Sequence, residues 1–358
     1  MKKILSVMLV LCISSVLLFA GGTSEKAAVA EETAEIVPDK TVTGNIMIYT
    51  SIYEDIVTMM DDALAEKFPN CNIEFFQGGT GNIQTKVAGE MATGKLGCDM
   101  MLVAEPAYSL ELDEEGFLHK YLSPNRTNLR FDYDKDGAWY PVRVCNMVLA
   151  YNPEMYKPSD LATSYKDFAA DSALKGYISM GNPLTSGTTM AAAAALSEKY
   201  GFGYFDQLGK QQVMVESGST ALAKLETGEC KELMILEESV LKKREEEGSS
   251  ISVIYPDDGV ILIPSTVMTV EGAKSANNNI ASCEKVTDWL LSEEGQRFIV
   301  KGWMHSVLKG WNSGDKIPYD SISTDDLIKK DMGLDWVRCY KQRTEIREAF
   351  EKSVSLSK

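Results

Sequence analysis

Short apolar segments that end in polar or glycine-rich turns recur along this chain and alternate with helix-patterned segments. Apolar runs at 45–49 and 73–76 each lead into a helical pattern, and a third run follows at 100–104. The same alternation resumes between residues 178 and 238. Strands and helices that alternate in this way form a mainly parallel sheet with helices on its faces. The sequence therefore predicts an α/β fold.

Two long apolar segments, near 142–152 and 260–270, flank the second set of alternating elements. A length of 358 residues also favours about two domains. We therefore expect two α/β lobes joined by two crossing strands. Lobe 1 is predicted to contain residues 44–145 and 265–358, and lobe 2 residues 146–264.

The amino terminus has the pattern of a secretory signal. Lys2 and Lys3 precede an apolar run that ends near Ala20. We predict a signal peptide over residues 1–22 and a flexible linker over 23–43, so the protein is expected to be exported, periplasmic or extracellular. An uncleaved segment that anchors the chain in the membrane is the alternative.

Charge and cysteine content limit the possible partners. A formal net charge of −16 argues against binding to nucleic acid or to an anionic membrane surface. No C-x-x-C pair occurs, so the sequence does not choose between buried thiols and disulfides. The cysteines outside the predicted signal are Cys71, Cys98, Cys145, Cys230, Cys283 and Cys339.

The turn that opens the alanine-rich segment 191–195 is a candidate anion site. Small residues at a helix start leave backbone N–H groups free, and the helix dipole favours negative charge there. The alternative is that Thr185 or Ser186 is a simple helix cap. The candidate residues are Ser186, Gly187, Thr188 and Thr189.

Other candidates follow from the rule that ligands bind at the carboxyl ends of strands in such sheets. The turns after the first three strands supply Ser51 and Tyr53, Gly79 and Thr80, and Glu105. Two polar residues also interrupt the apolar strand near 142–152. We predict that Asn146 faces the cleft, whereas Arg143 either pairs in the core or faces the cleft.

Several motifs, in this order, resemble the extracellular (periplasmic) solute-binding proteins of ABC importers. They include IMIYTSIYEDI, FFQGGTGNIQTKVAGE, CDMMLVAEP, MGNPLTSGTTMAAAAAL and VIYPDDGVILIPSTVM. The similarity is to the group that contains ferric-iron, thiamine, phosphonate and sugar-phosphate binders, and it runs from Ile46 to Trp311. It implies a type II periplasmic-binding-protein fold, with the two crossing strands as a hinge.

The resemblance also implies a site in the cleft between two lobes. The anion site of the group falls on Ser186, Gly187 and Thr188. Iron-binding relatives carry two adjacent tyrosines where this chain has Glu237 and Glu238, which weakens an iron assignment. If iron is the ligand nevertheless, Tyr53, Glu105 and Glu237 are the expected ligands.

The sequence does not support an enzyme. Only His119 and His305 are present, Ser186 lacks a G-x-S-x-G context, and no zinc-type spacing occurs. No cofactor is expected. We expect a protein that captures a small anion, such as a sugar phosphate or phosphonate, and delivers it to an ABC permease and its ATPase. Glu237 or Glu238 is expected to accept hydrogen bonds from the ligand, and contact with the membrane is expected only through the permease.

Overall fold

A computed structural model describes residues 36–311 and 322–355 of the chain. The predicted signal peptide and the first part of the predicted linker lie outside the described residues. One mixed sheet forms the centre of the unit that begins at Ile36. In their order across the sheet, the strands are β2 (Cys71–Gln77), β1 (Gly44–Thr50), β3 (Met100–Ala104), β9 (Ile261–Thr269), β4 (Trp139–Tyr151), β7 (Glu232–Leu236), β5 (Ile178–Met180) and β6 (Met214–Val215), and β8 (Ser252–Ile254) pairs with β4.

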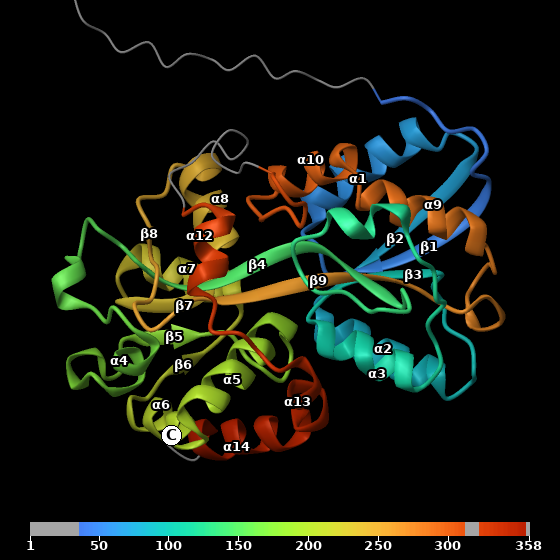
Figure 1. The fold of residues 1–358 in the computed structure, drawn as a ribbon. Coiled ribbons are helices and arrows are strands. Elements are labelled where there is room, and N and C mark those ends of the chain that lie inside the picture. Colours follow the sequence, from blue (N-terminus) through green and yellow to red (C-terminus); the bar gives the residue numbers. More distant parts are fainter. Residues whose placement is uncertain (1–35, 312–321, 356–358) are drawn as a thin grey trace, which may run out of the picture. The chain divides into compact units, whose positions relative to one another are not determined.

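The two long strands β4 and β9 join the two ends of this sheet. They pair antiparallel from Trp139↔Met268 to Met147↔Ile261, and every residue of both strands is buried. Figure 1 shows both strands crossing the middle, with β1–β3 at one end and β5–β7 at the other. Within each end, β1 pairs parallel with β2 and β3, and β5 with β6 and β7. The α/β fold and both crossing strands are therefore confirmed.

Helices follow the strands and cover the sheet. Those that matter below are α1 (Glu54–Lys67), α2 (Thr80–Met91), α3 (Pro106–Glu114), α5 (Gly187–Tyr200), α6 (Gly203–Lys210), α7 (Gly218–Thr227), α8 (Glu237–Glu247), α9 (Ile280–Leu290) and α10 (Glu293–Lys301). Residues Ala191–Ala195 of α5 are all buried, because methyl side chains let this helix lie close to β4 and β9. Ser292 caps α10 by accepting the N–H of Gly295 at 3.2 Å.

The carboxyl-terminal helices contact both ends of the sheet. They are α12 (Thr324–Lys330), α13 (Trp336–Lys341) and α14 (Arg343–Ser355). Helix α13 packs on α3, whereas α14 packs on α5 and α6. The predicted lobe 1 includes these terminal helices, but α14 contacts helices of the predicted lobe 2.

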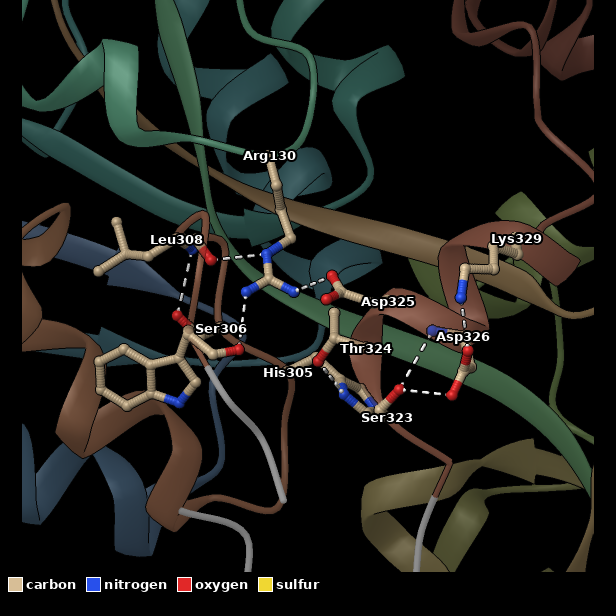
Figure 2. Close-up of polar contacts among 10 residues, drawn as sticks. Arg130, His305, Ser306, Leu308, Ser323, Thr324, Asp325, Asp326 and Lys329 are labelled. Carbon is tan, nitrogen blue, oxygen red and sulfur yellow. Dashed lines mark hydrogen bonds and ion pairs between the residues drawn. The ribbon is translucent and has the colours of Figure 1, made fainter. Parts of the chain in front are cut away.

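Helix α12 is held by contacts with the segment that follows α10. Thr324 Oγ1 lies 3.0 Å from His305 Nδ1, and Arg130 bridges the carbonyl of Leu308 and the carboxylate of Asp325 (Figure 2). His305 is itself joined to β4, because its backbone exchanges hydrogen bonds with Val144. The helix is therefore linked to a crossing strand.

The cysteines outside the predicted signal are free thiols. Five of the six are buried, and Cys71 is partly buried. The sequence left open whether these cysteines form disulfides or remain thiols, and in the structure they are thiols. Burial raises the pKa of Cys145 and Cys283, so these two thiols are un-ionised at neutral pH.

The buried carboxyl of Glu232, at the start of β7, should make stability depend on pH. Its Oε2 accepts the N–H of Ala162 at 3.1 Å, its Oε1 has no partner in the described residues, and burial raises its pKa from 4.5 to about 8. The folded protein therefore keeps a proton that the unfolded chain releases above pH 4.5. The contribution of the protonated Glu232 carboxyl to the free energy of unfolding is fully present below pH 4.5. This contribution decreases as the pH rises to about 8.

Glu232→Gln should remove this dependence while preserving shape. Urea unfolding at several pH values should show the variant gaining stability relative to wild type as the pH rises from 4.5 to about 8. Glu229→Gln, at an exposed position, is the control. Parallel pH profiles for wild type and Glu232→Gln would show that this carboxyl does not titrate as described.

Candidate ligand-binding site

A cavity of about 330 Å³ lies where strand ends and helix starts meet. Its walls come from both ends of the sheet and from the crossing strand β4. The lining residues are Ser51, Tyr53, Gly79, Thr80, Ala104, Arg143, Met147, Gly181, Asn182, Thr185, Ser186, Gly187, Thr188, Thr189, Glu216, Ser217, Gly218, Ala221, Leu233, Met234, Ile235, Leu236 and Ser239.

Several helices begin at this cavity. The residues that precede α1, α2, α5, α7 and α8 all line it. Helices α1 and α8 carry carboxylates in their first turns, which offset the positive end of the helix dipole. Helices α2, α5 and α7 have no acidic residue in the first turn. Three helix ends without an acidic residue in the first turn therefore meet at one cavity, which favours an anionic ligand.

The start of α5 combines a capping side chain with free backbone donors. Ser186 Oγ accepts the N–H of Thr189 at 3.2 Å and lies 3.1 Å from the hydroxyl of Thr188. Within the described part of the chain, the N–H groups of Gly187 and Thr188 have no acceptor. Ser186 is thus a helix cap, as the simpler interpretation expects, and still leaves two donors for a ligand.

The start of α7 repeats this arrangement. Ser217 Oγ accepts the N–H of Thr220 at 3.3 Å. The N–H groups of Gly218 and Ser219 have no acceptor among residues 36–311 and 322–355. Ser217 and Gly218 line the same cavity as the start of α5, so donors from two helices face one space.

Arg143 supplies a positive charge to the cavity wall. Its side chain is 3% exposed, its Nε donates to Ser265 Oγ at 2.9 Å, and its Nη1 donates to Met304 Sδ at 2.8 Å. Its Nη2 has no acceptor among the described residues, and the residue lines the cavity. Arg143 therefore combines the two predicted alternatives. Part of its guanidinium is paired in the core, and the residue also lines the cavity.

Two acceptor-bearing groups also lie in the lining. Tyr53 Oη is 2.9 Å from Ser239 Oγ, and burial raises the pKa of this phenol. Glu216 Oε1 accepts from Lys224 Nζ at 2.6 Å, whereas Glu216 Oε2 is buried without a partner in the described structure. The sequence prediction omitted Glu216, Ser217 and Gly218, although they follow a short apolar run as the other candidates do.

The predicted site residues fall into two groups. Those at the turns after β1, β2 and β5 line the cavity, namely Ser51, Tyr53, Gly79, Thr80, Ser186, Gly187, Thr188 and Thr189. The others, Glu105, Asn146, Glu237 and Glu238, are buried and lie outside the lining.

Asn146 and Glu237 belong to a buried polar cluster. Glu237 Oε2 accepts from Asn146 Nδ2 at 3.1 Å and lies 2.9 Å from His305 Nε2, while its Oε1 accepts from Tyr255. Side chains alternate between the two faces of a strand, so Asn146 points to the opposite face from Arg143 and Met147. These contacts give the Glu237 carboxylate partners within the protein.

The other two carboxylates are also enclosed. Glu105 is fully buried at a left-handed backbone position, φ 76°, and pairs with Arg343 at 2.9 Å. Burial raises the pKa of Glu238, and the nearby Arg143 acts in the opposite direction. Among the described residues, no three His, Cys, Asp or Glu side chains form a group that could hold a metal ion.

Comparison with known families decides the class of the protein. The family of bacterial extracellular solute-binding proteins matches residues 100–320, which is more than half of the chain. The chain belongs to this family. The protein is therefore the periplasmic solute-binding component of an ABC importer and is not an enzyme. It works with a permease and an ATPase.

Solved structures share the fold of this solute-binding protein. Iron-bound HitA from Pseudomonas aeruginosa is 18% identical with a TM-score of 0.75, over 86% of this chain and 99% of that one. AfuA from Actinobacillus pleuropneumoniae, with fructose-6-phosphate bound, is 20% identical with a TM-score of 0.72, over 87% and 99%. The ferric binding protein from Campylobacter jejuni is 14% identical with a TM-score of 0.72, over 86% and 99%.

At these identities the likeness establishes the fold, and the ligands of these proteins differ from one another. No curated protein matches the sequence. In the described residues, no helix is both long and apolar enough to span a membrane.

Proposed function

We propose that the solute-binding protein captures a small organic anion, a phosphate ester or phosphonate, in the cavity described above. The observation that carries this proposal is that the starts of α2, α5 and α7, which have no acidic residue in their first turns, meet the buried guanidinium of Arg143. Free N–H groups and a fixed positive charge are the groups that bind phosphoryl oxygens best.

Local donors have to supply the affinity in this proposal. The chain carries a formal net charge of −16, so the field of the whole protein does not attract an anion from a distance. Hydrogen bonds to a charged group contribute about 1.5–3 kcal/mol each. A few such bonds from α5 and α7 are enough for micromolar binding, which requires roughly 8 kcal/mol.

Relatives support two ligand classes, and the cavity favours one of them. AfuA was solved with fructose-6-phosphate and HitA with iron. For ferric iron we expected Tyr53, Glu105 and Glu237 as ligands. Only Tyr53 of these lines the cavity, and the two carboxylates are engaged elsewhere. Iron stays the alternative, and the phosphorylated ligand is the proposal.

A matched ligand pair tests the proposal. Isothermal titration should show saturable binding of fructose 6-phosphate or another sugar phosphate, and no binding of the corresponding free sugar at the same concentration. Ferric citrate is the third ligand. Equal affinity for the free sugar would exclude anion recognition, and tight ferric binding with a tyrosinate absorption band would favour iron.

We also propose that the two lobes close around the ligand, with β4 and β9 as the hinge. Lobe 1 contains residues 44–145 and 265–358, and lobe 2 contains residues 146–264. The starts of α2 and α5 meet across the cavity, where Gly81 N–H donates to the carbonyl of Thr185 at 3.3 Å. A Cβ atom at Gly81 would lie 2.6 Å from that carbonyl oxygen. A side chain at this position therefore conflicts with the closed arrangement.

Gly81→Ala should weaken ligand binding by about fivefold or more, because the steric conflict costs roughly 1–3 kcal/mol. In this proposal the free protein is open and lacks this contact, so its thermal unfolding should change little. Gly89→Ala on the same helix is the control, because nothing lies within 4 Å of a Cβ there. Equal affinities for both variants would show that this approach of α2 and α5 is not needed for binding.

A further inference from the structure

We infer that Glu216 selects the ligand by requiring a hydrogen-bond donor, a hydroxyl or ammonium group, beside the anionic group. This inference rests on the proposed function, because it concerns a ligand held in the same cavity. It narrows the ligand class to phosphate esters or phosphonates that carry such a donor close to the phosphorus.

One oxygen of the Glu216 carboxylate is hydrogen-bonded, and the other has no partner among the described residues. Lys224 Nζ holds Oε1 at 2.6 Å and also lies 3.0 Å from Glu229 Oε1, so the lysine is fixed between two carboxylates. Oε2 is buried and has no donor in residues 36–311 and 322–355. A buried acceptor without a partner is unfavourable, and a ligand donor can offset this cost.

The backbone fixes this carboxylate beside the anion donors. The N–H of Glu216 donates to the carbonyl of Met180 at the end of β5, at 3.1 Å. Ser217 follows directly and caps α7, whose first N–H groups, on Gly218 and Ser219, have no acceptor in the part of the chain that the structure describes. Glu216 and a set of anion donors are therefore neighbours in the lining of one cavity.

The electrostatics of this arrangement discriminate among anions. A carboxylate in a low-dielectric cavity repels an oxyanion that offers no proton. A hydroxyl or ammonium group between the two negative charges replaces that repulsion with a charge-assisted hydrogen bond. Glu216 thus has the role that the sequence assigned to Glu237 or Glu238.

Two ligand pairs that differ only in the donor test the inference. They are 2-aminoethylphosphonate against ethylphosphonate, and glycerol 3-phosphate against propyl phosphate. In titration calorimetry, wild type should bind the donor-bearing member of at least one pair about tenfold or more tightly, the effect of one charge-assisted hydrogen bond. Glu216→Gln should reduce that preference at least fivefold.

Controls separate this inference from the proposed function. Glu229→Gln changes the exposed partner of Lys224 outside the cavity lining and should keep the preference. Melting temperatures of both variants check folding. A wild-type preference that Glu216→Gln leaves unchanged would overturn the role of Glu216 alone. Failure of every phosphorylated probe to bind wild type would overturn the proposed function and the inference with it.

Discussion

Replacing Ser186 with alanine and Thr188 with valine is expected to weaken binding of a phosphate ester at least tenfold. Both side chains line the cavity, and their hydroxyl oxygens lie 3.1 Å apart at the start of α5. Each hydroxyl can donate to a phosphoryl oxygen, and each bond to a charged group is worth about 1.5–3 kcal/mol. Titration calorimetry on the double variant measures the loss.

The double variant also loses a helix cap, so a control must separate capping from binding. Ser292→Ala removes the equivalent cap of α10, in which Ser292 Oγ accepts the N–H of Gly295 at 3.2 Å. Each cap loss should lower stability by about 0.5–2 kcal/mol. Only the Ser186/Thr188 variant should lose affinity, and wild-type affinity in that variant would contradict an anion site at α5.

Arg343→Met is expected to cause the largest loss of stability. Arg343 pairs with the fully buried Glu105 at 2.9 Å and also with Glu111, and it joins α14 to the start of α3. Removing one partner of a buried ion pair leaves the other charge without compensation, which costs about 3–5 kcal/mol. Urea unfolding of the free protein measures this change.

An exposed ion pair and a compensating change serve as controls. Lys329→Met breaks the exposed pair with Asp326 and should change stability far less than Arg343→Met does, because solvent screens exposed pairs. Glu105→Gln combined with Arg343→Met removes both charges and should recover part of the lost stability. A loss below about 1 kcal/mol for Arg343→Met alone would show that Glu105 does not depend on this ion pair for compensation of its charge.

The fold could be predicted from the sequence because its signals are local. The run at 100–104 agrees with β3, the apolar residues 233–236 form most of β7, and both crossing strands occur where long apolar segments predict them. Each strand can be recognised from a few residues, namely its apolar composition and the turn that follows it. The turns after β1, β2 and β5 reach the cavity for the same reason.

The buried carboxylates could not be placed in this way, because their partners are distant in the sequence. Glu105 pairs with a residue 238 positions away, and Glu237 contacts His305, 68 positions away. Nothing near Glu237 distinguishes it from Glu216, which lines the cavity instead. Which polar side chains meet depends on tertiary packing.

The sequence also could not predict which side chains of β4 face the cavity. Arg143 and Asn146 are three residues apart and therefore lie on opposite faces of the strand. The sequence reveals that opposition but not which face borders the cavity, since both faces of this central strand are buried. Arg143 lines the cavity, whereas Asn146 joins the cluster around Glu237.

Nuclear magnetic resonance of protein labelled with ¹⁵N-glycine tests the central claim most directly. During titration with a phosphate ester, the amide signals of Gly187 and Gly218 should shift together with one dissociation constant, because their free N–H groups donate to the anion. Gly89 and Gly248, which do not line the cavity, should keep their positions. Saturable binding that leaves Gly187 and Gly218 unchanged would contradict an anion site at these helix starts.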